Sequence, residues 1–217
     1  MKTQVWLSVA LVLACAGSAC RVSPPSCEEM IPTRMRSLPF DALTRENAPS
    51  WIIANVDPGA ANLTWHNDYG GSAAWAWSDG VRSYDLVFQA PAVAPNLSLG
   101  LRDSSLILSD ALRCFGDPQY YRAAKTGGAL VFEVWYTVTG IAFQHAENAS
   151  SSRGRAIAAD QPLRTILLAQ PGSVTEFARR VYPQLQSPAG QQELLEEVRP
   201  WPATFAEVTY TLHTETK

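Results

Sequence analysis

Three histidines are the residues of this chain best suited to acid–base or metal chemistry: His66, His145 and His213. Each lies in a segment that we expect to be a strand. His145 precedes Glu147, and His213 precedes Glu215, at a spacing of two, which places both side chains on one strand face. A carboxylate could orient such an imidazole as a general base, and imidazoles from neighbouring strands could bind zinc. Because no His-x-His or His-Glu-x-x-His spacing occurs, we favour exposed strand ends and predict no metal site and no cofactor.

Acidic side chains offer a second kind of chemistry, since glycoside hydrolysis uses a pair of carboxylates. The candidates are Asp68, Asp79, Glu133 and Glu207, of which Glu133 is expected to point outward by strand alternation. Nucleophile motifs such as Gly-x-Ser-x-Gly and phosphate-binding glycine loops are missing. We therefore predict a non-enzymatic protein. The alternative is a hydrolase of envelope or extracellular polymers, which would require His66, His145 and Glu133 to meet in a cleft.

Aromatic residues point to a binding face. Trp75 and Trp77 share one face of a predicted strand, whereas the adjacent Trp135 and Tyr136 must point to opposite faces. Exposed aromatic side chains on a sheet could bind a sugar or a protein. The interpretation that we favour is a core filled with large aromatic rings on one face of the sheet, with scattered rings on the surface of the other. We take Trp75, Trp77, Trp135 and Tyr136 as the candidate binding residues, for a protein or small-ligand partner that the sequence does not identify.

The first 19 residues have the pattern of a signal peptide: Lys2, an apolar run, and then small residues. Cleavage after Ala16 is one option. Gly-Ser-Ala-Cys20 is also similar to a bacterial lipobox, and Val-Leu-Ala-Cys15 is the alternative. Lipidation of Cys20 would attach the protein to a membrane without a spanning helix. We therefore expect a secreted or lipid-anchored protein outside the cytoplasm.

Two further cysteines, Cys27 and Cys114, would remain as an even pair in an oxidising compartment. A disulfide between them would close a loop of about 87 residues and contribute about 2–4 kcal/mol. The alternative is that Cys114 is a buried free thiol.

Residues 20–40 contain four prolines among serines and charges, which predicts a tether, followed by one domain over residues 41–217. Residues 51–56 could form a short helix capped by Ser50, or a strand rich in β-branched residues. Asp79-Gly80 separates two alternating runs and predicts a hairpin with a type I′ turn. Tyr84, Leu86 and Phe88 form the more apolar face of its second strand.

The stretch 106–145 is the most clearly specified part of the chain. Ser109 is expected to cap a helix over residues 110–115, which Gly116 and Pro118 end. Three strands joined by tight turns follow. Further on we predict a strand over 163–169, a helix capped by Ser173, a helix over 189–199 and a strand over 205–213. These elements predict an α+β fold with an antiparallel sheet and short helices.

Residues 51–88 and 109–146 show the same order of signals: an apolar element ending in Asp-Pro, a short strand, Gly-Gly, a Trp-bearing strand, glycine and a strand. This order predicts a tandem helix-βββ repeat. With Leu-Ser-Asp-Ala-Leu-Arg-Cys-Phe-Gly-Asp-Pro at 108–118 and Val-Trp-Tyr at 134–136, the chain resembles the outer-membrane-assembly lipoproteins of the SmpA/OmlA family and the β-lactamase inhibitory protein. That resemblance implies an antiparallel sheet and a binding or assembly role. The usual first helix of the family is not evident before Ser109, and the chain after Asn148 lies outside the pattern.

Charge and sequons complete the expectations about partners. The net charge of −3 argues against nucleic acid as a partner. Asn62, Asn96 and Asn148 each begin an Asn-x-Ser/Thr sequon. In a eukaryotic secreted glycoprotein, which is a further alternative, these asparagines would carry glycans on surface loops.

Overall fold

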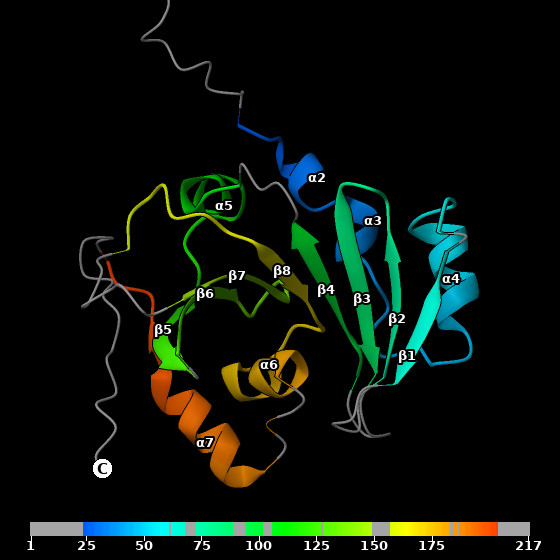
Figure 1. Cartoon of the computed structure of the whole chain (residues 1–217). Coiled ribbons are helices and arrows are strands. Elements are labelled where there is room, and N and C mark those ends of the chain that lie inside the picture. The colour runs from blue at the N-terminus through cyan, green and yellow to red at the C-terminus, as the bar shows by residue number, and fades with distance from the viewer. Residues whose placement is uncertain are drawn as a thin grey trace, which may run out of the picture.

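A computed structural model gives the fold of the chain (Figure 1). It describes residues 24–60, 62–67, 73–88, 94–101, 106–126, 128–148, 157–182, 185 and 187–203. The predicted signal peptide, Cys15, Cys20, Asp68, Glu207, His213, Glu215 and the predicted strand 205–213 lie outside these residues. A nine-stranded antiparallel sheet and several short helices make up the described part, so the α+β prediction is confirmed.

The strands follow one another in the order β1-β2-β3-β4-β8-β7-β6-β5-β9 across the sheet. Their bounds are β1 Thr64–Asn67, β2 Ala73–Ser78, β3 Arg82–Phe88, β4 Asn96–Leu101, β5 Tyr120–Thr126, β6 Ala129–Tyr136, β7 Ile141–Asn148, β8 Thr165–Leu168 and β9 Val198–Pro200. The helices are α2 Cys27–Met30, α3 Thr33–Arg36, α4 Ala48–Asn55, α5 Leu108–Phe115, α6 Val174–Val181 and α7 Pro188–Glu197.

The sheet consists of two halves with the same element order. Helix α4 precedes the meander β1–β4, and helix α5 precedes β5–β8. The two meanders meet where β4 pairs with β8, with Leu97 opposite Leu168 and Leu99 opposite Ile166. We call β1–β4 the first half-sheet and β5–β8 the second half-sheet. The predicted helix-βββ order is therefore present in both halves, each extended by a fourth strand.

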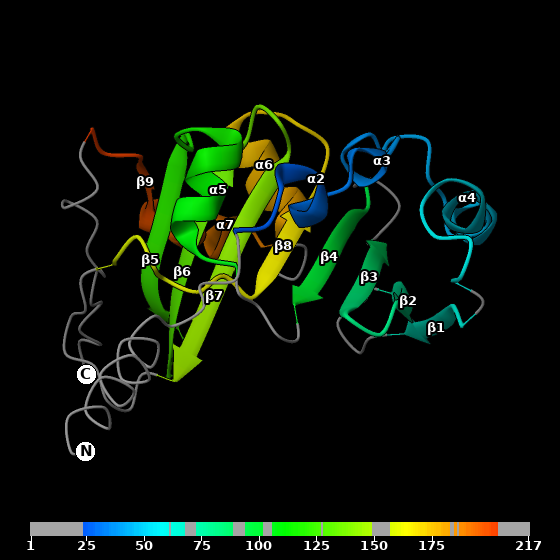
Figure 2. The ribbon, with the colours of Figure 1, turned by 90° about the horizontal axis from the view of Figure 1, so that it is seen from above.

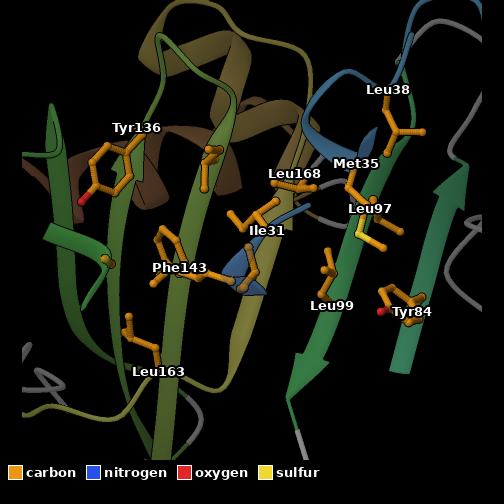
Figure 3. Close-up of a cluster of buried hydrophobic side chains, with 14 of the residues drawn as sticks. Ile31, Met35, Leu38, Tyr84, Leu97, Leu99, Tyr136, Phe143, Leu163 and Leu168 are labelled. Atoms are coloured by element: carbon orange, nitrogen blue, oxygen red, sulfur yellow. The ribbon is translucent and has the colours of Figure 1, made fainter. Parts of the chain in front are cut away.

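One face of the sheet, face A, carries the main hydrophobic core of both halves. Leu86, Leu97 and Phe143 point to this face and are at most 1% exposed. Residues from α2 to α5 pack on it, among them Ile31, Met35 and Leu108. Figure 3 shows Ile31 and Met35 between side chains of the two half-sheets. Burial of this continuous apolar face supplies the main drive for folding.

In the described part of the chain, the opposite face, face B, is covered mainly over the second half-sheet. Helices α6 and α7 lie on the second half-sheet, on the side opposite α5 (Figure 2). Phe177 and Leu194 pack there with Trp135, Ala142 and Leu167. On the first half-sheet, α6 contacts face B at strand β4, where the buried Asn96 donates to the Arg180 carbonyl. Helices α3 and α4 lie behind β1–β4 in Figure 1.

The predicted tether is wrong where the structure describes it. Residues 24–40 form two one-turn helices whose apolar side chains are buried in the core: Met30, Ile31, Met35, Leu38 and Phe40. A single helical turn is too short to show an apolar period, so the sequence pattern gave no sign of it. The folded unit therefore begins before residue 41.

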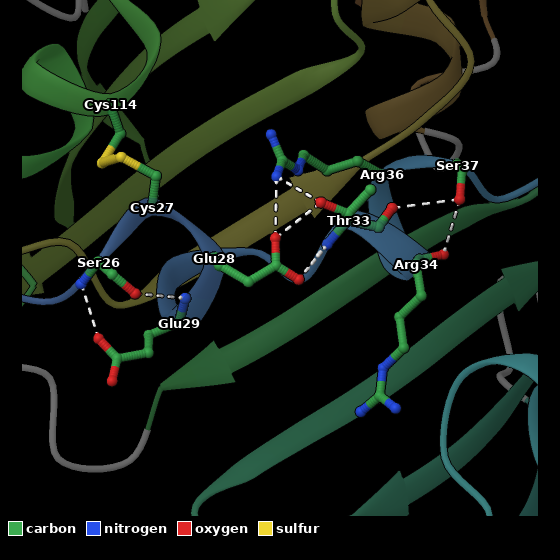
Figure 4. Close-up of polar contacts among 9 residues, drawn as sticks. All are labelled: Ser26, Cys27, Glu28, Glu29, Thr33, Arg34, Arg36, Ser37 and Cys114. Atoms are coloured by element: carbon green, nitrogen blue, oxygen red, sulfur yellow. Dashed lines mark hydrogen bonds and ion pairs between the residues drawn. A yellow bond between two sulfur atoms is a disulfide. The ribbon is translucent and has the colours of Figure 1, made fainter.

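Cys27 and Cys114 form a disulfide that joins this N-terminal segment to α5, with their Cα atoms 5.3 Å apart (Figure 4). Polar contacts support the same segment. Ser26 and Glu29 cap α2 reciprocally, and the Glu28 carboxylate accepts hydrogen bonds from the Thr33 backbone (2.8 Å) and hydroxyl (2.7 Å). The predicted pairing is thus present, and the free-thiol alternative for Cys114 is wrong.

Two helices begin earlier in the chain than the sequence analysis predicts. Helix α4 begins at Ala48, ahead of Ser50, because Pro49 suits the first turn and Asn47 exchanges hydrogen bonds with Thr44. The strand alternative for 51–56 is therefore wrong.

Helix α5 begins at Leu108, so Ser109 lies in its first turn and does not cap it. The Asp110 carboxylate instead accepts the Ile107 N–H at 3.3 Å. By contrast, Ser173 caps α6 through the predicted pairing with Glu176.

The hairpin between β2 and β3 is present, but its turn is not type I′. Ser78 pairs with Ser83, which leaves a four-residue loop. Only Gly80 in this loop has a positive φ, at 88°. The Asp79 carboxylate accepts the N–H groups of Val81 (2.9 Å) and Arg82 (2.7 Å), and thereby holds the loop.

Candidate binding site

The residues expected to do acid–base chemistry are not brought together. His66 is exposed on face B at the end of the first half-sheet, whereas His145 is buried on face A of β7. Glu133 lies on face B of β6, on the other side of the sheet from His145. The cleft that the hydrolase alternative requires is therefore not formed.

His145 does share a strand face with Glu147, as predicted. Its Nε2 lies 3.5 Å from Glu147 Oε2. The exposed position expected for this histidine is wrong, because His145 is 5% exposed.

Glu133 is fully buried, so the outward orientation predicted for it is wrong. Helix α7 lies on this face of the second half-sheet (Figure 2). Glu197 of that helix forms an ion pair with Arg122, in which Glu197 Oε2 lies 2.6 Å from Arg122 Nη2. Arg122 Nη1 lies 3.7 Å from Glu133 Oε2. Gln144 donates to Glu133 Oε1 (2.6 Å), and Trp135 donates to Oε2 (3.1 Å). This is a closed polar network beneath α6 and α7.

The pKa of Glu133 is raised above its ordinary value in this network. Burial is the largest cause, and the nearby Glu197 carboxylate acts in the same direction. Arg122, Gln144 and Trp135 act in the opposite direction but do not overcome the loss of hydration. Both carboxylates of the network are buried, and the Arg122–Glu197 ion pair joins α7 to strand β5.

Asp79, a second candidate carboxylate, is engaged in the β2–β3 turn. Besides two backbone N–H groups, it accepts the Tyr84 hydroxyl at 2.7 Å. Burial would raise the pKa of Asp79, but these hydrogen bonds outweigh it and lower that pKa. No second carboxylate is among its hydrogen-bond partners in the described part.

Three of the four aromatic residues proposed for binding are core residues. Trp77 is 5% exposed and stacks on Tyr84 with ring centroids 4.9 Å apart. Trp135 is fully buried on face B beneath Phe177, and Tyr136 is 2% exposed on face A. Trp135 and Tyr136 do point to opposite faces, but both faces of β6 are covered. An exposed binding role for these three residues is therefore wrong.

Trp75 is partly exposed and belongs to an aromatic cluster at the end of the first half-sheet. The ring centroids of Trp75 and Trp65 lie 5.1 Å apart, and those of Trp65 and Phe88 lie 6.4 Å apart. All three side chains are on face A, where the register places Trp65 opposite Trp75. The Arg45 guanidinium carbon lies 4.0 Å from the centre of the Trp65 ring. We call Trp65, Trp75, Phe88 and Arg45 the edge cluster.

The local sequence explains how the edge cluster is held. In β2, alanines alternate with Trp75 and Trp77, so both large rings lie on face A. The Trp75 Nε1 donates to the Arg45 carbonyl at 3.0 Å, which ties the segment before α4 to the sheet. Trp65 donates to the Asn67 side chain at 3.0 Å. Sequence reasoning missed Arg45, because no periodic signal links this residue to strand β1.

The sequons differ in their surroundings. Asn62 is exposed. Asn96 is 3% exposed and donates to the Arg180 carbonyl, so its side chain is not on a surface loop. Asn148 is the last residue of β7.

Comparisons with protein-family models, curated proteins and solved structures found no match to this chain. Among the described residues, no group of three or more histidine, cysteine or acidic side chains could hold a metal ion. In that same part of the chain, no helix has both the length and the apolar character needed to cross a membrane.

Proposed function

We propose that this protein is a non-enzymatic binding protein that acts outside the cytoplasm, attached to a membrane through Cys20 or secreted, with the edge cluster as its binding site. The observation that carries the proposal is the contrast among aromatic side chains. Trp77, Trp135 and Tyr136 are buried, whereas Trp65, Trp75 and Phe88 are partly exposed side by side. Aromatic side chains next to an arginine are the residue types that contribute most to protein binding sites.

The disulfide supports the proposed compartment. Bonds such as Cys27–Cys114 form and persist in secreted proteins and are rare in a reducing cytosol. Lipidation of Cys20 would leave these two cysteines free to pair. A role in assembly of the cell envelope, like that implied by the resemblance of residues 106–145, would suit such a protein.

Site-specific photo-crosslinking in the cells that produce the protein would test the proposed site. A photo-crosslinking amino acid at position 65 should yield a discrete adduct. The same group at Val138, which is 71% exposed in the β6–β7 turn, serves as the control. The proposal fails if position 65 gives no adduct beyond that of position 138.

A further inference from the structure

Strand β1 is the terminal strand of the sheet, so one of its edges has no neighbouring strand in the described part. Alternate residues of such a strand direct their N–H and C=O groups away from the sheet, where another chain can pair with them. The β9 end of the sheet is protected, because Pro200 has no N–H to donate and Arg199 carries a charge. Strand β1 reads Thr-Trp-His-Asn and contains neither proline nor lysine. Among the residues that the structure describes, this edge is therefore open to strand addition.

The edge cluster lies beside this open edge. Trp65 belongs to β1 itself, and Trp75 and Phe88 follow on the next two strands. A residue of an added strand opposite Trp65, pointing to face A, would lie against these rings. Aromatic and β-branched side chains form favourable pairs of this kind.

Arg45 adds a preference for a negatively charged partner at the same place. Its guanidinium stacks on Trp65, and the residue is exposed. The arginine ion pairs found among the described residues involve Arg36, Arg113 and Arg122, and none involves Arg45. A stacked guanidinium keeps its N–H donors directed outward, in the planar arrangement that suits a carboxylate.

We propose that strand β1 binds an extended, acidic polypeptide segment by strand addition, with an apolar side chain on Trp65 and an acidic side chain on Arg45. This inference rests on the proposed function and specifies the class of partner. The backbone of β1 supplies affinity, and the edge cluster selects residues that alternate on one face of the added strand.

Three short synthetic peptides would test this inference. The first alternates valine with glutamate, the second replaces the glutamates with lysine, and the third interrupts the first with a central proline. Binding to the disulfide-bonded protein is followed by two-dimensional NMR of backbone amides and tryptophan indoles. We expect the glutamate peptide to shift the amides of residues 64–67 and the Trp65 indole. The lysine and proline peptides should bind at least about fivefold more weakly.

Matched variants separate charge from general surface effects. Arg45→Gln should weaken binding of the glutamate peptide about fivefold. Arg34→Gln, at an exposed arginine of α3, should leave it unchanged. Trp65→Leu should weaken it while the dispersed NMR spectrum shows that the fold persists.

The inference is overturned if the lysine peptide binds as well as the glutamate peptide, if the shifts fall outside β1, or if none of the peptides binds. An adduct at position 65 together with any of these results would leave the proposed binding site standing and reject the acidic polypeptide as its partner.

Discussion

The two half-sheets share an element order and a common core on face A, yet they differ on face B. The second half-sheet places Trp135, Ala142 and Leu167 on this face, and α6 and α7 cover them. The first half-sheet places small or polar residues there: Thr64, His66, Ala74, Ala76, Ser83, Asp85 and Ser98, with Val87 as the one large apolar side chain. An antiparallel sheet can leave one face to water when that face is polar.

Strands β2 and β6 show how the sequence encodes this difference. Strand β2 reads Ala-Ala-Trp-Ala-Trp-Ser, with its large residues two positions apart. Strand β6 reads Ala-Leu-Val-Phe-Glu-Val-Trp-Tyr, and all but its first residue are buried. Alternation is typical of a strand with one covered face, and a continuous apolar run is typical of a strand covered on both. Four matched pairs of substitutions test this difference between the two half-sheets.

The largest effect should come from a charge placed on face B of the second half-sheet. Ala142→Lys puts an ammonium where the side chain is fully buried, so we expect a loss of at least about 4 kcal/mol in the free energy of unfolding. Ala76→Lys is the matched change on the first half-sheet, opposite Asp85, and should cost less than about 0.5 kcal/mol. Urea denaturation followed by circular dichroism measures both. Equal losses would mean that face B is covered over both halves.

Truncation of the two tryptophans should give the next largest difference. Trp135→Ala should destabilise the fold by about 3–5 kcal/mol, because it leaves a cavity between the sheet and α6. Trp75→Ala removes a partly exposed ring and should cost about 1–2 kcal/mol. The same unfolding measurement applies. A smaller loss for Trp135 than for Trp75 would contradict the contrast between buried and partly exposed rings.

The third largest loss in the free energy of unfolding should come from removing the arginine of the buried network. Arg122→Met leaves the Glu133 and Glu197 carboxylates buried without their arginine, at a cost of about 3 kcal/mol. Arg113→Met, at an ion pair whose arginine is 46% exposed, is the control and should cost about 1 kcal/mol or less. If the two variants unfolded at the same urea concentration, the network would have no special role in seating α7.

The smallest effect concerns pH. Because burial raises the pKa of Glu133 above its ordinary value of 4.5, the folded protein binds a proton that the unfolded chain releases as the pH rises above that value. The contribution of this group to stability is therefore complete below pH 4.5 and is lost as the pH rises through the folded pKa. Glu133→Gln should reduce the fall in unfolding free energy between acidic and neutral pH by on the order of 1 kcal/mol.

Denaturation at a series of pH values tests this, with Glu196→Gln, at an exposed position of the same helix as Glu197, as the control. An unchanged pH profile for Glu133→Gln would show that Glu133 is already ionised throughout the range.

Much of the fold could be predicted because its signals are local. The capping box at Ser173, the glycine turns at Gly128 and Gly140 and the alternation in β3 each depend on a few neighbouring residues. The N-terminal segment escaped prediction because its burial depends on contacts with strands that follow much later in the chain. The burial of Glu133 escaped prediction for the same reason, because Glu197 of α7, which pairs with Arg122 in the same network, follows more than 60 residues later in the chain.

The candidate site could be predicted only in part. The alternation in β2 places Trp75 and Trp77 on one face, but Trp77 is buried, where it stacks on Tyr84, and Trp75 is partly exposed. Periodicity gives the face of a side chain and does not give its distance from the edge of a sheet. Arg45 contacts the Trp65 ring only in the folded protein, so no local sequence pattern predicts this contact.

The disulfide has a mechanical consequence. A pulling force applied to the N-terminal end of the chain enters the folded unit at Cys27 and passes through the covalent bond directly into α5. Residues 28–113 lie within the closed loop and carry no tension along their backbone while the bond is intact. A tethered protein could therefore bear load with its first half-sheet, and the edge cluster on it, shielded from stretching. Reduction of this one bond would move the load onto α2 and α3, whose single turns would be the first to extend.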